Sequence, residues 1–384
     1  MPDKKISILA LGFRPFYLLA SFWAIFTIFE WLLELQGYGI RSFKQLPGMQ
    51  WHAHEMIFGF AATVITGFAL TAVRAWTGLD TPKGLSLLAL VSLWAIARIG
   101  AFTGSIFFIV DICFLPIIAI VIGRLILKVK MYRNLFLPLI LIILGCLNAC
   151  FYLSNVGYIN LDTNYIIFAS LYLIVMIEIM IGNRIIPSFT ANAIPGLKQS
   201  RNQSLTKATI IGSALTFFLQ IVSAYALVNA IACFALASLH LNLLWGWRPL
   251  ATIEKPIVWI LHISYAWIPV GFLLLGFSQL GFITIYPALH VFGIGATGGL
   301  IIAMITRTAL GHTGRPLLAG LAEITAYFGI QATLLIWLLA NLSHGIWFYS
   351  LMVIAGFCWI CVFMIYIVKY FPLLTQPRPD GKAG

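Results

Sequence analysis

Residues 208–247 read ATIIGSALTFFLQIVSAYALVNAIACFALASLHLNLLWGW, a run of 40 residues without one charged side chain. A helix needs about 20 mostly apolar residues to cross the hydrocarbon core of a bilayer, so this run is long enough for two. Asn229, near its middle, marks the expected break between them. Residues 256–306 and 324–368 are free of charge in the same way. The pattern predicts an all-α fold, a polytopic bundle of transmembrane helices.

The composition of the 384 residues supports the same fold class. Hydrophobic residues make up 61% of the chain, charged residues only 9%, and the mean hydropathy is +1.00. Soluble domains carry roughly a quarter charged residues, so these proportions exclude a soluble enzyme and a disordered chain. In a soluble protein the net charge of +12 would suggest a nucleic-acid partner. Here the distribution of the basic residues explains it, and no nucleic-acid partner is expected.

Apolar segments of spanning length recur along the whole chain and predict one integral membrane domain over residues 1–384. The polar segment 187–207 is expected to be a cytoplasmic connector. The first apolar segment is too long for a signal peptide and lacks a small-residue cleavage site, so it is expected to remain as a helix. The twelve predicted spans lie near residues 16–36, 53–73, 84–102, 106–127, 134–154, 165–186, 208–228, 230–247, 257–277, 285–306, 317–340 and 346–368.

The basic residues orient these spans, because Lys and Arg concentrate in cytoplasmic loops. With the N-terminus inside, 20 of the 23 basic residues fall on the cytoplasmic side. Only Arg41, Lys44 and Arg98 fall on the opposite side. The distribution predicts that both the N- and the C-terminus are cytoplasmic.

The six cysteines all fall in predicted spans, so no disulfide framework is expected. Cys358 and Cys361 have CxxC spacing, but Val362 follows them. The CxxCH sequence that attaches c-type haem covalently is therefore absent.

Ionisable side chains at membrane depth are costly and mark functional sites, and a first group of them is WHAHEMIFG at residues 51–59. His52 and His54 are about 200° apart around a helix axis, so they cannot jointly hold one metal unless the helix end unwinds. Glu55 could orient an imidazole through a ring N–H, and the sulfur of Met56 suits Cu(I). The alternative is interfacial, because aromatic and histidine side chains also lie at headgroup level for amphipathic reasons.

A second group is HVFGIGATGG at residues 290–299. Its four glycines permit close helix packing or the approach of a flat ligand, and packing explains them adequately. Packing does not explain His290, which precedes them by one turn. The spacing of His54 and Gly59 matches that of His290 and Gly295, but the match is too weak to predict an internal repeat.

A third group is GNRIIPSFT at residues 182–190, preceded by Glu178. Asn183, Arg184 and Thr190 could bind an anion or a haem propionate. They could equally form a capped helix end beside lipid phosphate. Glu178 and Asp111 are expected to be isolated acids that do not form a proton path.

With these groups in view, the chain resembles the NnrS family of bacterial membrane proteins. The motifs that carry the resemblance are GFRPF at 12–16, WHAHEM at 51–56, NRIIP at 183–187, AMITR at 303–307 and LGHTGRP at 310–316. The resemblance implies a twelve-helix protein of the bacterial inner membrane that contains haem and copper. It also implies an association with denitrification and with resistance to nitric oxide stress.

The chemistry of the residues is compatible with non-covalent haem b held by histidine. The residues leave the ligand set open, and the favoured axial pair is His54 with His290. His240, near mid-depth, and His262, on the cytoplasmic side, form a second candidate pair. Two arginines complete the residues expected to bind the cofactor: Arg184 and Arg307.

Copper is the second expected metal, because imidazole and thioether are suitable ligands for it. His52 and His344 are expected to complete a copper site near His54 and His290, with Met56 as a further ligand. Two neighbouring residues, Glu55 and Trp51, are expected to orient these ligands without binding the metal themselves.

Three functions are compatible with these expectations. The first is a haem and copper protein that senses, buffers or handles nitric oxide under nitrosative stress. The second is a redox enzyme acting on nitric oxide, although the sequence lacks the polar relay that a proton-consuming reductase needs. The third is a secondary transporter for a metal, haem or a small anion, although matched broken helices are not evident. The lipid bilayer and nitric oxide, or a related small ligand, are the expected partners.

Overall fold

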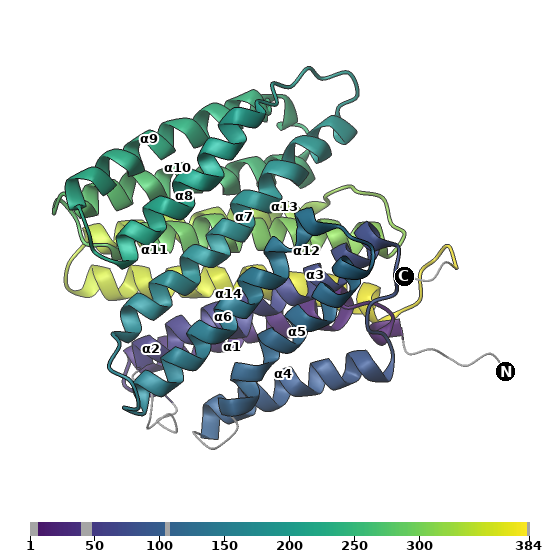
Figure 1. Ribbon diagram of the computed structural model, residues 1–384, viewed down its shortest axis with the longest axis horizontal. Helices are drawn as coiled ribbons and strands as arrows, with labels where there is room; N and C mark the ends of the chain where they lie inside the picture. Colours follow the sequence, from purple (N-terminus) through teal and green to yellow (C-terminus); the bar gives the residue numbers. More distant parts are fainter. Residues whose placement is uncertain (1–6, 40–47, 104–107, 382–384) are drawn as a thin grey trace. The chain divides into compact units, whose positions relative to one another are not determined.

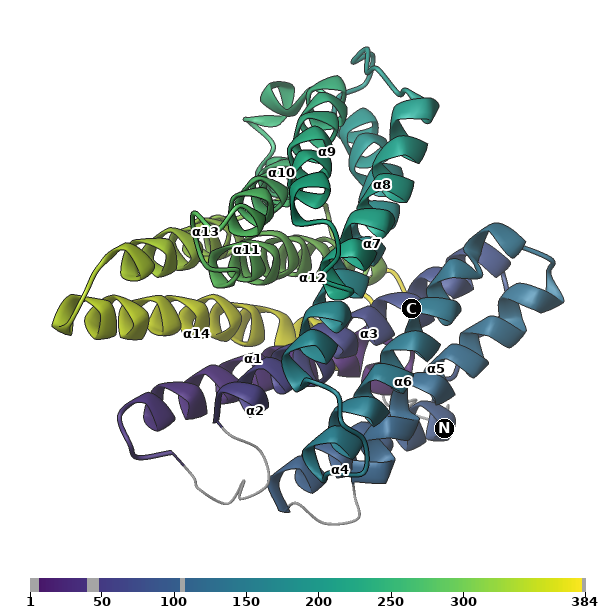
Figure 2. The same cartoon turned by 60° about the vertical axis from the view of Figure 1, so that its left-hand side comes forward.

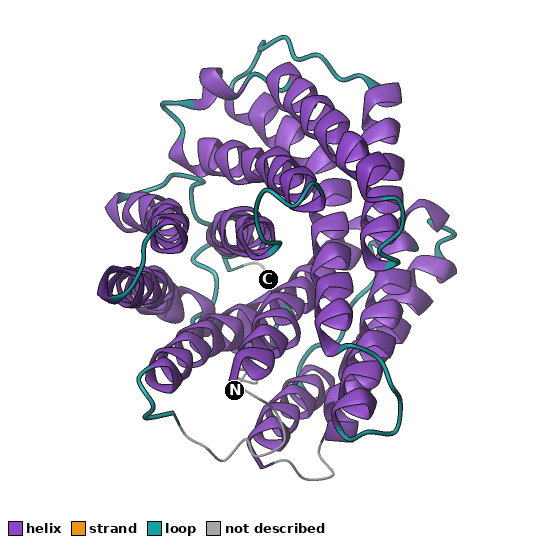
Figure 3. Ribbon diagram, turned by 90° about the vertical axis from the view of Figure 1, so that its left-hand side faces the viewer, coloured by secondary structure: helices purple, strands orange, loops and turns teal. Residues whose placement is uncertain are grey.

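The computed structural model describes residues 7–39, 48–103 and 108–381 of the chain. Helices are the regular elements of these described residues, as Figure 3 shows. The predicted all-α fold is confirmed. Arg41 and Lys44, which were assigned to the outer side, lie outside the described residues.

The elements follow one another along the chain as long helices joined by short connections (Figure 1). Two of the long helices are composite, because a π-helical stretch joins two α-helical parts. The composite helices are α2 (Gly48–His54) with η2 (Glu55–Ala61) and α3 (Ala62–Thr77), and α11 (Tyr286–His290) with η5 (Val291–Gly298) and α12 (Gly299–His312). The other long helices are, in chain order, α1 (Phe13–Leu35), α4 (Leu85–Thr103), α5 (Phe108–Lys128), α6 (Phe136–Asn155), α7 (Thr163–Ala193), α8 (Gln203–Ile221), α9 (Ala226–Gly246), α10 (Pro256–Gln279), α13 (Leu321–Leu342) and α14 (Ile346–Thr375). Short 3-10 turns at Ser7–Leu9, Tyr132–Asn134 and Pro249–Thr252 complete the set.

Eleven of the described helices are long and apolar enough to cross a membrane. The remaining long helix, α4, contributes a shorter apolar stretch, Leu85–Gly100. Each of the twelve predicted spans overlaps one of these twelve long helices, of which eleven meet the length and hydropathy of a membrane span. The chain is a multi-pass membrane protein whose outward apolar side chains contact the lipid bilayer.

The break predicted at Asn229 is wrong. The chain turns at residues 222–225 instead, where Ser223 and Tyr225 have φ angles of +50° and +55°. Asn229 lies inside α9, fully buried, and its side-chain amide donates a hydrogen bond of 3.0 Å to Oε1 of Gln220. A buried, hydrogen-bonded asparagine is compatible with a helix interior, so its polarity did not mark a turn.

The connector predicted at 187–207 is also shorter than expected. Helix α7 continues through Pro187 to Ala193. The hydroxyls of Ser188 and Thr190 donate to the carbonyl oxygens of Arg184 and Ile186 in the preceding turn. These bonds, which Ser and Thr make readily inside helices, let polar residues extend the helix beyond the apolar segment.

The chain divides into two compact units, which are described separately. Unit 1 comprises Met1–Ser170, Ile305–Pro316 and Phe363–Gly384, and unit 2 comprises Leu171–Met304 and Leu317–Val362. In unit 1, α4, α5 and α6 lie side by side, and α1 packs on η2 and α3. In unit 2, α8, α9 and α10 lie side by side, and η5 packs on α10 and α13 (Figure 2).

Each unit contains one of the two π-helical stretches, η2 in unit 1 and η5 in unit 2. Each stretch starts directly after a histidine, His54 or His290. Such stretches are rare and frequently occur at functional sites. Each unit therefore has a π-helical stretch directly after one of the two histidines that the sequence analysis identified as candidate ligands.

Candidate functional site

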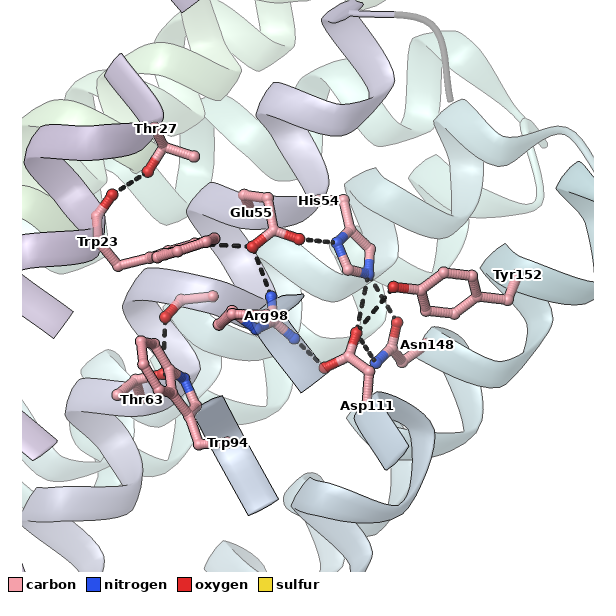
Figure 4. Close-up of polar contacts among 11 residues, drawn as sticks. Trp23, Thr27, His54, Glu55, Thr63, Trp94, Arg98, Asp111, Asn148 and Tyr152 are labelled. Atoms are coloured by element: carbon pink, nitrogen blue, oxygen red, sulfur yellow. Dashed lines mark hydrogen bonds and ion pairs between the residues drawn. The ribbon is translucent and has the colours of Figure 1, made fainter. Parts of the chain in front are cut away.

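A buried ion cluster surrounds His54 in unit 1 (Figure 4). Arg98 of α4 lies between Glu55 of η2 and Asp111 of α5 and contacts both carboxylates. Its Nη1 donates to Oε2 of Glu55 at 2.5 Å, and its Nη2 donates to Oδ1 of Asp111. The three residues are at most 2% exposed. Charges this deeply buried need partners of opposite sign, and this arrangement supplies them.

His54 completes the cluster through both ring nitrogens. Its Nδ1 lies 2.9 Å from Oε1 of Glu55, and its Nε2 lies 2.8 Å from Oδ1 of Asn148. Nδ2 of Asn148 donates to Asp111, so its oxygen is the atom that faces His54. Both ring nitrogens of His54 are therefore engaged by oxygen atoms inside the cluster.

Two further donors saturate the carboxylates. Nε1 of Trp23, on α1, donates to Oε2 of Glu55 at 2.7 Å. The hydroxyl of Tyr152, on α6, donates to Oδ2 of Asp111 at 3.0 Å. Every oxygen of Glu55 and Asp111 therefore has a hydrogen-bond donor. The cluster joins side chains from α1, α2, η2, α4, α5 and α6.

The expectation that Asp111 is isolated is wrong, and sequence reasoning missed Arg98, Asn148 and Tyr152 as parts of the cluster. The available signal was charge. Arg98 and Asp111 are opposite charges in two consecutive predicted spans, and such residues inside membranes pair with one another.

A glycine in the π-helical stretch η2 leaves space for the side chains of the cluster. Gly59 lies beside Trp23 and Glu55, and a Cβ at this position would collide with Nε1 of Trp23 and Oε2 of Glu55. A glycine therefore permits the indole to reach the carboxylate across the helix surface. This is a packing reason for the glycine in the WHAHEMIFG segment.

His52 and His54 face different helices, as their spacing predicted. The ring of His52 stacks on Trp31 of α1, with centroids 4.9 Å apart. The ring of His54 stacks on Phe151 of α6, with centroids 4.8 Å apart. Both residues lie in the regular α-helix α2, so the two imidazoles do not converge on one point.

His290 in unit 2 has a different environment. Its Nδ1 donates to the carbonyl oxygen of Tyr286 at 2.9 Å, and its ring stacks on Trp337 of α13 with centroids 3.8 Å apart. Nε2 has no hydrogen-bond partner among the residues that the structure describes. One turn further on, Gly293 borders open space, because nothing lies within 4 Å of where its Cβ would be. The other glycines of this segment pack against side chains, Gly295 on Trp267 and Leu334.

Two further histidines of unit 2, His240 and His262, lie in separate polar environments. His240 uses both nitrogens, Nδ1 with the hydroxyl of Tyr265 at 2.9 Å and Nε2 with Oγ of Ser213 at 3.1 Å. His262 donates from Nε2 to Oγ1 of Thr190 at 2.8 Å, and its buried Nδ1 has no partner among the described residues.

The other predicted site residues are on several different elements. Arg184 is half-buried on α7, and Arg307 is 8% exposed on α12. His344 is exposed in the turn between α13 and α14, and Met56 is half-buried on η2. Within the described ranges, no three His, Cys, Asp or Glu side chains gather closely enough to hold a metal ion. His52 and His54 belong to unit 1, and His240, His262, His290 and His344 belong to unit 2.

Comparison with known protein families identifies the family of the chain. The model of the NnrS family, described as NnrS protein, matches residues 7–378, nearly the whole chain. The chain belongs to the NnrS family. The match covers the buried cluster around His54 as well as His290, so both lie in the part of the chain that defines an NnrS protein. Among curated proteins, no match was found.

Proposed function

We propose that this NnrS-family protein holds non-covalent haem b and copper in the inner membrane of a bacterium and acts in the response to nitric oxide and nitrosative stress, in association with denitrification. Family membership supports the metals and the biological setting. His290 is the observation that supports a haem ligand in this chain.

The geometry of His290 fits an axial ligand. The hydrogen bond from Nδ1 to the Tyr286 carbonyl fixes the tautomer, so the lone pair is on Nε2. Metal-bound histidines commonly have their second nitrogen oriented in this way. The stack on Trp337 fixes the plane of the ring, and the open space at Gly293 leaves room beside it.

His54 and His240 fit this role less well. Both nitrogens of His54 are already engaged by oxygen atoms, of Glu55 and of Asn148. Both nitrogens of His240 are also engaged. His262 keeps one buried nitrogen without a partner among the described residues and is the second candidate ligand. The pairing of His54 with His290 stays a prediction.

Bound haem would supply an iron atom that binds nitric oxide, and copper would supply a second redox-active metal. For copper, His52, His344 and Met56 have suitable donor atoms. The proposal of copper rests on the family resemblance and on this donor chemistry.

The visible spectrum and the metal content of detergent-purified protein test the proposal. We expect a Soret band and bound copper in the wild type, and loss of most haem in a folded His290→Ala variant. His344→Ala is the matched control for haem alone, because it removes an exposed histidine from a turn and should leave the haem spectrum unchanged, whereas its copper content should fall if His344 is a copper ligand.

Other outcomes would change the assignment. A folded His290→Ala variant that keeps its spectrum would refute the ligand. Loss of haem from a folded His54→Ala variant would support the pair predicted from the sequence. Wild-type protein with neither haem nor copper would contradict the proposal and favour a transporter. Turnover of nitric oxide with an electron donor would favour a redox enzyme.

A further inference from the structure

Three arginines lie close together at one end of unit 1 and are not used by the proposed haem and copper chemistry. They are Arg14 at the start of α1, Arg315 in the turn after α12, and Arg378 in the segment after α14. All three belong to unit 1, and we call them the arginine group. The distribution of basic residues along the chain predicts that this end of the unit faces the cytoplasm.

Hydrogen bonds join the three segments that carry the arginine group. Nη1 of Arg14 donates to the carbonyl oxygen of Gln376 at 2.9 Å, two residues before Arg378. Nη1 of Arg378 donates in turn to the carbonyl oxygen of His312 at 3.0 Å, three residues before Arg315. Arg315 and Arg378 are also close enough to the guanidinium of Arg14 to repel its charge. The group is therefore one local concentration of positive charge.

Two members of the group are held by carbonyl oxygens and form no ion pair with a carboxylate in the described part of the chain. Arg14 is 1% exposed, and its Nη1 donates a second hydrogen bond of 2.8 Å to the carbonyl oxygen of Leu374. Its Nε is buried without a partner among the described residues. Nη1 of Arg315 donates to the carbonyl oxygen of Thr313 at 3.3 Å. These are fixed cations, unlike basic side chains that extend freely from a helix end to the headgroups.

The charges of the arginine group do not balance within the described residues. Asp380 is the one carboxylate there that pairs with the group, through two hydrogen bonds of 2.8 and 2.6 Å from Arg378. The C-termini of α12 and α14, whose carbonyl oxygens accept from the group, each contribute roughly half a negative charge. The three guanidinium groups therefore keep about one positive charge without a counter-ion. Arg98 of the same unit is the internal comparison, because two carboxylates of the chain contact it.

We propose that the arginine group is a binding site for a phosphate group. A buried cation without a full counter-charge is stabilised by an anion from outside the chain. The guanidinium fork binds phosphate oxygens through two parallel hydrogen bonds, which makes arginine suited to this anion. Basic groups at the cytoplasmic ends of membrane helices also bind anionic lipid headgroups. Two sources share this chemistry, the headgroup of an anionic phospholipid and phosphate in solution.

Thermal denaturation of the full-length, delipidated protein in a nonionic detergent tests the proposal. Phosphatidylglycerol is added in one series, with phosphatidylcholine as the zwitterionic control. Inorganic phosphate is added in the other series, with sodium chloride at equal ionic strength as the control. We expect the melting temperature to rise with phosphatidylglycerol for a lipid site, or with inorganic phosphate for a site open to solution. No rise above the control in either series would overturn the proposal.

Arg315→Gln tests where the ligand binds. Among the described residues Arg315 bonds only within its own turn, so we expect this variant to fold. It should need about tenfold more ligand for the same rise, because it loses a charge-assisted contact. If it fails to fold, Arg315→Lys keeps the charge but removes the guanidinium fork, and it should also weaken binding.

Arg133→Gln is the matched control. Arg133 is an exposed arginine of the same unit, on the connection between α5 and α6, and its variant should respond to the ligand as the wild type does. A wild-type response of folded Arg315→Gln would overturn the proposal. Equal weakening in Arg133→Gln would also overturn it, in favour of a general attraction of anions to basic loops.

Discussion

Arg98 is the single residue on which the buried cluster of unit 1 depends. Its guanidinium contacts two carboxylates that no lysine or second arginine among the described residues neutralises. The structure therefore gives Arg98 a role beyond that of the outer-side basic residue to which the topology count assigned it.

We expect Arg98→Gln to destabilise the protein by about 3–5 kcal/mol, because removing one partner leaves buried charge uncompensated. Thermal denaturation of the detergent-purified variant measures the effect. The control is Lys83→Gln, which breaks the exposed Lys83–Asp80 ion pair and should cost about 0–1 kcal/mol.

A wild-type melting temperature for Arg98→Gln would show that the cluster does not hold the helices together. Neutralising Glu55 and Asp111 as well should recover part of the lost stability. Recovery is expected because a neutral polar group is far cheaper to bury than an ion.

At the scale of the element, two glycines of the π-helical stretches differ in their packing. Gly59 in η2 lies against Trp23 and Glu55, where no Cβ fits, whereas Gly293 in η5 borders open space. Gly295, which has the same spacing from the preceding histidine as Gly59, is also packed against side chains, so Gly59 and Gly293 are a contrasting pair for substitution.

We expect Gly59→Ala to destabilise the protein by about 1–3 kcal/mol, the usual cost of overpacking. Gly293→Ala should leave the melting temperature close to that of the wild type, because its methyl group meets no neighbour. Both variants can be compared by the fraction that stays monodisperse after heating. Equal loss of stability in the two variants would contradict this description of the stretches.

Two arginines also act at the scale of the element, because each donates hydrogen bonds to carbonyl oxygens at a helix C-terminus. Nη1 of Arg14, in the GFRPF motif, donates to the carbonyl oxygens of Leu374 and Gln376 at the end of α14. Arg378 donates to the carbonyl oxygen of His312, the last residue of α12. Cations near helix C-termini are favourable for this reason. These basic residues are therefore more than markers of the cytoplasmic side.

At the scale of the whole molecule, topology is the prediction that remains to be measured. The distribution of Lys and Arg predicts that both termini are cytoplasmic and that an even number of spans joins them. The connection between α6 and α7 should then face outward, and the one between α7 and α8 should face the cytoplasm.

Reporter fusions test this topology. Alkaline phosphatase fused after Tyr158 should be active, and fused after Arg201 it should be inactive. Green fluorescent protein fused at the same positions should give the reverse pattern. If the two phosphatase fusions are both active or both inactive, α7 does not cross the membrane.

The sequence by itself determined the fold class and nearly all of the helices. Long uncharged runs leave few alternatives in a chain with 9% charged residues, because backbone groups in lipid must be satisfied within a helix. Turns were predicted well where a glycine with positive φ follows the helix, as at Gly281 and Gly345. The turn near Asn229 was predicted at the wrong residue, because the hydrogen bond from Asn229 to Gln220 keeps this polar residue inside a helix.

Only the tertiary structure decided which polar groups meet. Glu55 and Glu178 are the same residue type in predicted spans, yet Glu55 lies against Arg98 and His54, whereas no cation among the described residues forms an ion pair with Glu178. Glu55 and Arg98 are 43 positions apart in the chain, so no local pattern joins them. The physical reason is that the state of a buried charge depends on neighbours within a few ångströms. In a helical bundle, those neighbours come from other helices.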